Sequence, residues 1–477
     1  MTQSNLGLIG LAVMGSNLAR NFASRGFRIS VYNRTNSKTN EFIKNFSSSA
    51  KKQGGALVGA SEYTEFIQSL ERPRKIIIMV KAGSPVDGVI AELLPHLEPG
   101  DIVIDAGNSF YKDTERRFLE LKAKGLHFVG MGVSGGEEGA LNGSSIMLGG
   151  APESWRELQP ALEAIAAKDF SGEPCVTYVG PGGAGHYVKM VHNGIEYAVM
   201  QMMSEAYAFL KIAYNLKPPA IADIFEKFSQ GKLNSFLFDI AVPVLRRPDD
   251  LTKKGFLIDK ILDRAGSKGT GAWASKDALD RGISITSITE AVYARSISAS
   301  KESRVALSKL YKNKLAPKKL PLPKFIPLLE NALYAGMISC YAQGYDLIQK
   351  TATEEKWDLN LAEISRVWEG GCIIRAKLLN VLHKAYQTSG SKNSSLFAVP
   401  GIVSLMKKYV PDLRAVVGVV SASGVSTPAL ATALFYFQDA TSKELSANFI
   451  QGLRDYFGAH TYERTDRPGN FHTNWIS

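Results

Sequence analysis

Near its beginning the chain reads Leu6-Gly7-Leu8-Ile9-Gly10-Leu11-Ala12-Val13-Met14-Gly15, four mostly apolar residues followed by a glycine-rich turn. The pattern after it is helical to about Arg25, so the stretch predicts a strand, a tight turn and a helix. It fits the G-x-G-x-x-G fingerprint of dinucleotide-binding folds, with Ala12 at the second glycine. The helix N-terminus would offer free N–H groups to a pyrophosphate. The sequence therefore predicts a Rossmann-like α/β domain at the N-terminus.

The end of the next predicted strand, Arg28–Tyr32, indicates which dinucleotide binds. This strand is followed by Asn33, Arg34 and Thr35. An NAD site usually has Asp or Glu here, to hold the ribose 2′-hydroxyl. The side chains of Asn33 and Arg34 offer hydrogen-bond donors instead, and a guanidinium suits a 2′-phosphate. The position favours NADP over the alternative of a solvent-exposed turn arginine.

Further strands end in loops that could bind ligands. The strand Lys75–Val80 is followed by Lys81 and Ala82, and Asp101–Asp105 is followed by Ala106-Gly107-Asn108-Ser109. Carboxyl ends of parallel strands meet at the edge of the sheet where ligands bind. The loop Ser134-Gly135-Gly136 offers a hydroxyl and backbone N–H groups that could hold a carboxylate. The remaining predicted strands and helices of this region are His127–Gly130, Ser145–Leu148, Val176–Val179, Asp113–Ala123 and Glu153–Ala167.

A polar stripe is expected on the helix that begins with Gly185-His186-Tyr187-Val188-Lys189-Met190-Val191-His192-Asn193-Gly194-Ile195-Glu196-Tyr197. Residues three, four and seven apart share a helix face, so Lys189, His192, Asn193 and Glu196 lie together among apolar neighbours. Lys189 and Glu196 are about 10 Å apart along the axis, which suits two ends of one small molecule. A buried lysine can take up a proton and a buried glutamate can give one. The stripe predicts a pocket, and the alternative is a solvated Lys/Glu face.

The pattern of predicted strands and helices divides the chain of 477 residues into three parts. Strands and helices alternate over residues 1–180, and long helical patterns fill residues 181–445. Within these, Ala222-Asp223-Ile224 resembles Ala362-Glu363-Ile364 at an offset of 140 residues, which predicts a duplicated helical unit. Residues 446–477 are expected to form an irregular tail whose aromatic residues dock on another surface, such as that of a second subunit.

Composition excludes several other classes. The net charge of +11 is scattered and no nucleic-acid module is recognisable, so phosphorylated small molecules are the expected partners. Cys175, Cys340 and Cys372 are too few and too widely spaced for a disulfide framework or a metal site, which favours reduced thiols in a cytosolic protein. The uncharged run 415–437 contains Pro428 and several hydroxyl residues, so two buried segments are expected and no membrane span.

Together these motifs resemble those of the 6-phosphogluconate dehydrogenase family, the decarboxylating, NADP-dependent enzymes of the pentose phosphate pathway. The resemblance runs essentially end to end. It implies a Rossmann-like domain, a large all-α domain with an internal duplication, and a C-terminal tail that reaches into the neighbouring active site of a cytoplasmic homodimer. The motifs that carry it are Gly10–Gly15, Asn33–Thr35, Gly107–Ser109, Ser134–Gly139, Gly185–Tyr197, Lys268–Gly271 and Arg454–His460.

The resemblance also implies roles for individual residues. Lys189 would be the general base and Glu196 the general acid, with no metal. The substrate, 6-phosphogluconate, would be contacted by Asn108, Ser134, Gly135, Gly136, His192, Asn193 and Tyr197. Its phosphate would be held by Lys268 and Arg295, with Arg454 and His460 from the neighbouring subunit. NADP would be held by Gly10, Leu11, Ala12, Val13, Met14, Gly15, Asn33, Arg34, Thr35, Val80, Lys81, Ala82 and Asn108.

Two other functions stay open at this stage. One is a β-hydroxyacid dehydrogenase acting on a small unphosphorylated acid, although such proteins are much shorter. The other is a non-catalytic NADP-binding protein. Four positions also depart from the family pattern and make loop shapes less certain, namely Ala106, Leu141, Leu148 and Ala272.

Overall fold

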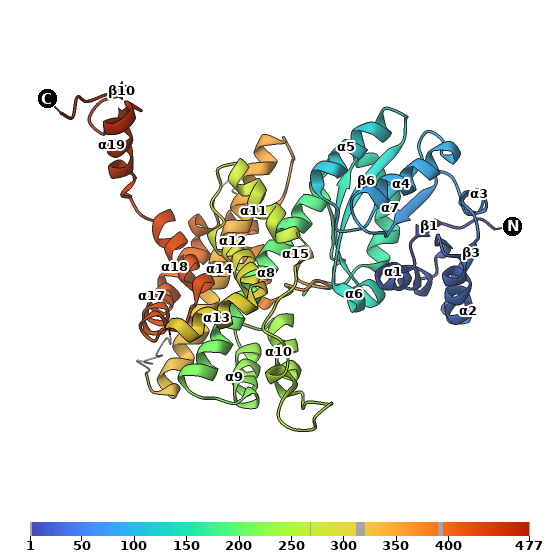
Figure 1. The fold of residues 1–477 in the computed structure, drawn as a ribbon. Helices are drawn as coiled ribbons and strands as arrows, with labels where there is room; N and C mark the ends of the chain where they lie inside the picture. The colour runs from blue at the N-terminus through green and yellow to red at the C-terminus, as the bar shows by residue number, and fades with distance from the viewer. Residues whose placement is uncertain (1, 268, 312–319, 390–394, 477) are drawn as a thin grey trace.

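The structure is a computed structural model that describes residues 2–267, 269–311, 320–389 and 395–476. A sheet domain lies at the N-terminal end of the molecule, a body of helices lies beside it, and a small C-terminal unit projects from the far side (Figure 1). Lys268, one of the residues expected to bind phosphate, lies outside the described residues.

The N-terminal sheet has eight strands in the order β3-β2-β1-β4-β5-β6-β7-β8. Strand β1 lies between β2 and β4 and is parallel to both. Strands β2 and β3 lie on one side of β1 and the later strands lie on its other side, so the strand order reverses at β1. This is the switch point at whose carboxyl edge such sheets bind ligands. The strands are β1 Leu6–Ile9, β2 Arg28–Tyr32, β3 Ala56–Ala60, β4 Lys75–Ile78, β5 Ile102–Asp105, β6 His127–Ser134, β7 Ser145–Gly150 and β8 Val176–Gly180.

Helices cover both faces of the sheet, which explains why its central strands are continuously apolar. Successive residues of a strand point to opposite faces. Accordingly, Leu8 and Ile77 belong to one apolar cluster, and Ile9 and Ile76 to another. The helices of this domain are α1 Val13–Ser24, α2 Asn36–Lys52, α3 Tyr63–Gln68, α4 Ser84–Leu93, α5 Tyr111–Lys122, α6 Gly136–Asn142 and α7 Pro152–Ile165, with the short 3₁₀ helix η1 Leu94–His96.

Strand β7 is the exception to the parallel order, because it runs antiparallel to β6. The connection between them contains only the short helix α6. A parallel return needs a crossover of about a dozen residues or more, so the chain turns back instead. The sequence predicted both strands but not this reversal. The turn brings Ser134, Gly135 and Gly136 to the side of the sheet that faces the helical domain.

The helical domain is built around two long helices, α8 Ala184–Ala213 and α14 Leu322–Glu354, which pack against each other in the largest apolar cluster. Each is followed by two shorter helices, α9 Pro218–Gln230 and α10 Phe236–Arg246 in one case, α15 Leu361–Val367 and α16 Lys377–Ser389 in the other. This recurrence agrees with the predicted repeat. The remaining elements are α11 Thr270–Asp280, α12 Thr286–Ala299, α13 Lys301–Tyr311, α17 Pro400–Ala422, α18 Pro428–Ala440, and the 3₁₀ helices η2 Leu257–Asp259 and η3 Leu396–Ala398.

Two smaller predictions concern the uncharged run and the cysteines. The uncharged run 415–437 is divided between α17 and α18, and none of the helices in the described ranges is long and apolar enough to cross a membrane. Cys175, Cys340 and Cys372 are buried free thiols.

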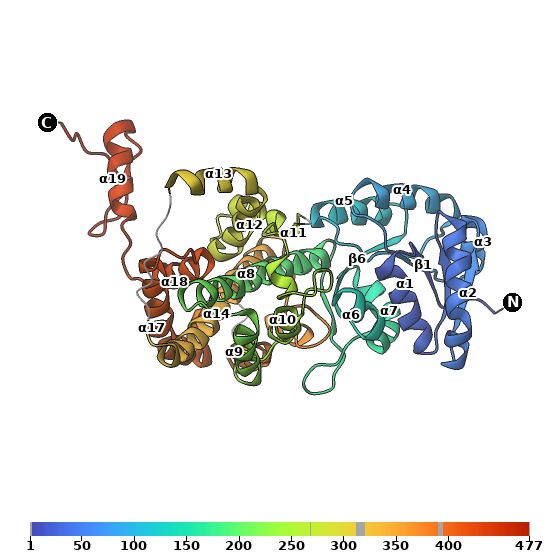
Figure 2. The same cartoon turned by 60° about the horizontal axis from the view of Figure 1, so that its bottom comes forward.

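The C-terminal unit differs from the irregular tail that the sequence suggested. Helix α19 Ala447–Gly458 is followed by a two-stranded antiparallel hairpin of β9 Tyr462–Glu463 and β10 Asn470–Phe471. The carboxylate of Asp455, which is fully buried, accepts hydrogen bonds from the backbone N–H groups of Thr461 and Thr473 and from the Trp475 indole. This one carboxylate joins the hairpin to α19. In Figures 1 and 2 the unit stands apart from the rest of the chain.

Candidate active site

A cavity of ≈ 590 Å³ opens where the carboxyl edge of the sheet meets the helical domain. Six separate parts of the chain contribute to it: the start of α1, the strand ends of the sheet, α8, the segment before and at the start of α11, α12, and the segment after α15. Its lining residues come from both domains. These residues are Met14, Asn108, Val133, Ser134, Gly135, Gly136, Lys189, Asn193, Glu196, Tyr197, Gly266, Ser267, Thr270, Arg295 and Ile373.

Lys189 enters this cavity from α8, which packs against β6 and β7 and runs into the middle of the helical domain (Figure 2). Its side chain is only 7% exposed. Burial lowers the pKa of Lys189 to about 8, against an opposing effect of the Glu196 carboxylate. The amine is therefore neutral in about one molecule in ten at pH 7, far more often than an ordinary lysine, and a general base acts in this neutral form.

His192 connects the polar stripe to the end of β6. Its Nε2 lies 3.2 Å from Ser134 Oγ, and its Nδ1 lies 3.3 Å from Lys189 Nζ and 3.1 Å from Asn193 Oδ1. Burial and the neighbouring Lys189 lower the pKa of His192 well below its usual value, so the imidazole is neutral. Glu196 Oε2 lies 3.9 Å from His192 Nδ1, and the Glu196 side chain is 19% exposed. The predicted stripe thus lines a pocket and is no solvated face.

A basic group closes another side of the cavity. The Arg295 guanidinium lies 3.3 Å from the centre of the Tyr197 ring and donates a hydrogen bond to the Gly266 carbonyl at 3.0 Å. Tyr197 Oη lies 3.5 Å from Ser267 Oγ. These contacts hold the permanent positive charge of Arg295 at the wall of the cavity. Such a charge suits a phosphate.

The glycine-rich turn has the shape that a dinucleotide requires. Gly10 has φ +103°, and a Cβ at this position would lie 2.4 Å from the Met79 carbonyl oxygen, so only glycine fits. The backbone N–H of Leu11 donates to Asn33 Oδ1 at 3.1 Å, which ties the turn to the end of β2. Arg34 is exposed beside it, and Thr35 is the N-cap residue of α2.

The dinucleotide turn and the cavity are contiguous, because Met14 and Asn108 line the cavity. Val80, Lys81 and Ala82 directly follow β4 at the same sheet edge. The residues present therefore fit NADP, with donors at Asn33 and Arg34 for a 2′-phosphate and the start of α1 for the pyrophosphate.

Comparison with known proteins gives a consistent answer over the whole chain. The NAD binding domain of 6-phosphogluconate dehydrogenase matches residues 5–180, and the 6-phosphogluconate dehydrogenase C-terminal domain matches residues 185–475. The chain is 48% identical over 477 residues to the NADP(+)-dependent, decarboxylating 6-phosphogluconate dehydrogenase of Bacillus subtilis, with 100% of both chains covered. It is 46% identical over 477 residues to the decarboxylating 6-phosphogluconate dehydrogenase of Escherichia coli, again with 100% of both covered.

The chain belongs to the 6-phosphogluconate dehydrogenase family. A solved structure of Plasmodium falciparum 6-phosphogluconate dehydrogenase superposes with a TM-score of 0.94 at 43% identity, and covers 99% of this chain and 100% of its own. That protein is described in its apo form and in complex with NADP+ and with 6-phosphogluconate. The predicted fold of a Rossmann-like domain followed by a large helical domain is confirmed.

Two predicted residues of this family member are not brought to the cavity within its own chain. Arg454 lies in α19 and His460 follows it, in the unit that stands apart from the body in both views (Figures 1 and 2). The other described site residues are at the cavity or at the adjoining dinucleotide turn.

Sequence reasoning assigned no role to five residues that line the cavity, Val133, Gly266, Ser267, Thr270 and Ile373. Ile373 follows α15, and the nearby Gly371 carbonyl lies close enough to Gly135 to exclude a side chain there. This contact joins residues more than two hundred positions apart, and no local pattern signals it. Thr270 had a signal, since it belongs to the motif that was quoted for Lys268.

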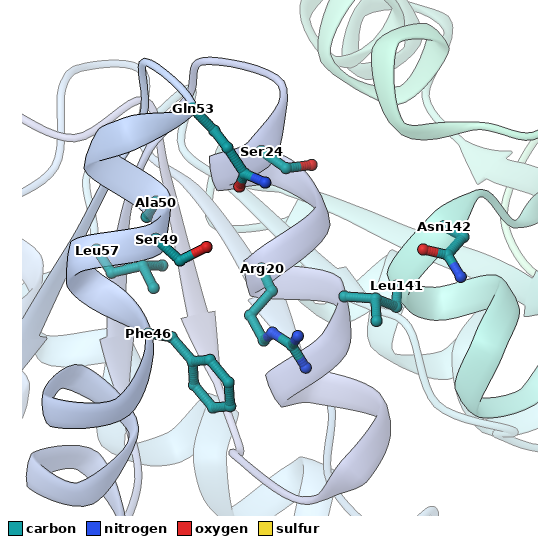
Figure 3. A pocket seen from close by; sticks show the side chains of 9 residues that line it. All are labelled: Arg20, Ser24, Phe46, Ser49, Ala50, Gln53, Leu57, Leu141 and Asn142. Carbon is teal, nitrogen blue, oxygen red and sulfur yellow. The ribbon is translucent and has the colours of Figure 1, made fainter.

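A smaller pocket of ≈ 230 Å³ lies between α1, α2 and α6 (Figure 3). It contains none of the predicted site residues, apart from the family departure Leu141. The Arg20 guanidinium lies 4.2 Å from the centre of the Phe46 ring and donates to Asn17 Oδ1. The three helices all end at this pocket, and their carboxyl ends favour a positive charge. Arg20 therefore has a structural role.

In the described residues, no group of three or more His, Cys, Asp or Glu could hold a metal ion.

Proposed function

We propose that the chain oxidises and decarboxylates 6-phospho-D-gluconate to D-ribulose 5-phosphate and CO₂ while NADP+ is reduced, with Lys189 as base and Glu196 as acid. One observation carries the proposal. A buried amine whose pKa is lowered to about 8 and a carboxyl on the same helix face line one cavity, beside a dinucleotide turn and a permanent cation.

Oxidation requires a base at the hydroxyl of substrate C3. Neutral Lys189 takes the hydroxyl proton as the C3–H bond breaks, and burial of its side chain keeps water from protonating it first. NADP+, when bound, supplies the acceptor for the hydride. The neutral imidazole of His192 and the amide of Asn193 surround Lys189 without adding a charge that would disfavour its protonation.

Decarboxylation follows because the oxidised substrate is a β-keto acid. When its carboxylate leaves as CO₂, the electron pair of the broken bond moves towards the C3 carbonyl. Protonated Lys189 donates its proton to that oxygen and so stabilises the enol. Glu196, two helical turns from Lys189, then protonates the carbon that carried the carboxylate (substrate C2, which becomes C1 of the product) to give the ketose.

Binding is divided between the two ends of the cavity. Ser134, Gly135 and Gly136 end β6 and begin α6, where their hydroxyl and N–H groups suit the substrate carboxylate. Arg295 suits the phosphate at the other end, together with Tyr197 and Lys268. NADP is held by the Gly10–Gly15 turn, by Asn33, Arg34 and Thr35, and by the segments Val80–Ala82 and Asn108.

The site is completed by a second subunit in this proposal, with the C-terminal unit exchanged in a homodimer. Helix α19 exposes Phe449, Leu453 and Phe457, which share one helix face. The helix itself stands apart from the body of the chain in Figure 1. A groove of ≈ 910 Å³ between α8, residues 258–265 and α12–α13 ends at Arg295, which also lines the cavity. An α19 from a partner in this groove would bring Arg454 and His460 towards the substrate phosphate.

Turnover tests the reaction directly. The purified protein is assayed by NADPH absorbance with 6-phosphogluconate, with NAD+ in place of NADP+, and with 3-hydroxyisobutyrate in place of the phosphorylated acid. We expect activity with 6-phosphogluconate and NADP+, and a lower kcat/KM with NAD+. Activity with 3-hydroxyisobutyrate alone would favour the unphosphorylated substrate, and activity with neither would favour a non-catalytic protein.

Subunit mixing tests the exchange. Lys189→Met and Arg454→Ala proteins are each expected to be nearly inactive, but a mixed dimer would contain one site with both wild-type residues. Mixing under conditions that exchange subunits should therefore restore activity. If the mixture stays as inactive as its components while exchange is verified by mass, both residues act from the same chain and the arrangement is wrong.

A further inference from the structure

Arg117 is a buried arginine on α5 that touches neither the cavity nor the dinucleotide turn. Its side chain is 1% exposed. Nε and Nη2 donate to the two oxygens of Asp87 on α4 at 2.8 and 3.0 Å, and Nη2 also donates to the Gly83 carbonyl at 3.0 Å. Nη1 donates to Asp105 Oδ2 at 3.4 Å. One guanidinium thus joins the loop after β4 to the end of β5.

Asp105 continues this connection into the loop that carries Asn108. It is fully buried, its Oδ1 accepts the Gly107 N–H at 3.0 Å, and its Oδ2 accepts the Ser109 hydroxyl at 2.6 Å. The carboxylate thereby fixes the residues on both sides of Asn108. A Cβ on Gly107 would lie 3.2 Å from the Val80 carbonyl oxygen, so the two loops are also in close contact with each other.

Helix α5 also contacts the helix that carries the proposed base. Thr114 Oγ1, one turn before Arg117, lies 2.7 Å from Nδ1 of the fully buried His186. His186 precedes Lys189 by one turn of α8. The same helix therefore fixes three segments that converge on the reacting end of the site: Val80–Gly83, Gly107–Ser109 and the start of α8.

We propose that Arg117 is a positioning residue, which holds the loops after β4 and β5 so that the nicotinamide half of NADP meets the substrate in front of Lys189. The inference rests on the proposed function for the identity of the ligands. Arg117 does not act on the adenine half, because the Gly10–Gly15 turn and Asn33–Thr35 are held by other contacts, among them Leu11 N–H to Asn33.

The chemistry of the pair explains why an arginine is needed. The forked guanidinium of Arg117 donates to both oxygens of Asp87 and to the Gly83 carbonyl at once, whereas a lysine offers a single ammonium group. The hydrogen bonds from Arg117 lower the pKa of Asp87 to about 2, so this partner stays ionised at neutral pH. Loss of the fork would leave the Asp105 carboxylate without its buried cation, and the two loops would no longer be tied together.

Arg117→Lys tests the inference, with Arg116→Gln as the matched control. Arg116 is the next residue of the same helix and also contacts Asp87, but it is 46% exposed and otherwise pairs only with Glu120 in the described contacts. The readouts are KM and kcat with NADP+ and 6-phosphogluconate, and the binding affinities of NADP+ and of 2′,5′-ADP, which lacks the nicotinamide half.

For Arg117→Lys we expect kcat to fall by about 10- to 100-fold, the scale of a small misplacement of reacting groups. The affinity for NADP+ should fall by about tenfold, while that for 2′,5′-ADP stays within about twofold. Arg116→Gln should leave all four quantities unchanged. Equal losses of NADP+ and 2′,5′-ADP would show a merely structural role, and unchanged kcat and NADP+ affinity would show no role. Either result overturns the inference.

Ser109→Ala gives a second measurement that removes no charge. It deletes the hydroxyl bond to Asp105 and should produce the same selective loss at a smaller size, about two- to fivefold in NADP+ affinity. If Arg117→Lys does not fold, an unchanged Ser109→Ala protein overturns the inference. The binding comparison needs no turnover, so a wild-type protein inactive on 6-phosphogluconate would disprove the proposed function and leave this test standing.

Discussion

The two long helices of the helical domain pack similarly, but Gln343 of α14 and the polar side chains of α8 differ in what they face. On α14 the polar group bonds to the protein, whereas on α8 the polar groups face a cavity. Both α8 and α14 cross the core, and each starts a unit of three helices. On α14, the amide of Gln343 is fully buried and makes two hydrogen bonds with Ser287 on α12, to its backbone N–H at 2.9 Å and its hydroxyl at 3.0 Å. On α8, Lys189, Asn193 and Glu196 face a cavity.

The difference teaches where a duplicated unit acquires a function. A buried polar group must find a partner, and for Gln343 of α14 the protein supplies it. The start of α8 lies at the carboxyl edge of the sheet, where the switch point leaves room for a ligand. Its polar groups are partly left for that ligand. The same scaffold therefore gives a structural helix in one copy and a helix that lines the proposed active site in the other.

The largest effect is expected from Lys189→Met, which removes the base and keeps an unbranched side chain of similar length. We expect kcat to fall at least ~100-fold, the low end of general-base contributions, with NADP+ binding retained. The exposed Lys227→Met on α9 serves as control. Turnover near that of the wild type in steady-state assays would remove Lys189 from the mechanism.

Glu196→Gln comes next. The enol formed after loss of CO₂ can still take a proton from water, so we expect kcat to fall by about tenfold or more with little change in NADP+ affinity. Glu226→Gln is the matched control, because Glu226 is an exposed carboxylate on α9 that pairs with Arg246. Equal activity of Glu196→Gln and the wild type would assign the acid to another group.

The pH profile gives a smaller and graded effect. Since the base acts in its neutral form and burial lowers the pKa of Lys189 to about 8, kcat/KM should rise with pH up to that value. Below it, the neutral fraction falls about tenfold per pH unit. Initial rates across this range, with stability checked at each pH, measure the midpoint. A midpoint near the usual lysine value of about 10.4 would contradict a desolvated base.

Gln343→Leu probes the other helix and should have the smallest effect on turnover. It leaves the Ser287 N–H buried without its acceptor, so the free energy of unfolding should fall by about 1–3 kcal/mol while kcat is unchanged. Ser287→Ala keeps the backbone bond and should cost less in the same denaturant titration. A large loss of kcat in Gln343→Leu would mean that α14 is also part of the active site.

Much of the sheet domain could be predicted because its signals are local. The Gly10–Gly15 turn needs glycine for a conformation set within a few residues, and the run Ile76–Ile78 shows burial on both faces. The polar stripe of Lys189, His192, Asn193 and Glu196 on α8 could likewise be predicted from helical spacing. Arg117 was not, because a charged residue on a predicted helix reads as solvent-exposed, and only packing against α4 and β5 buries it.

By itself, the sequence determined most strands of the sheet (β3 excepted), the preference for NADP and the face shared by Lys189 and Glu196. Each depends on residues close together in the chain, whose geometry follows from the fixed periods of strand and helix. The tertiary structure alone decided the reversal of β7, the hairpin folded on Asp455 and the joining of Asn108, Ser134, Lys189 and Arg295 around one cavity. These depend on contacts between distant segments, which packing and the satisfaction of buried polar groups select.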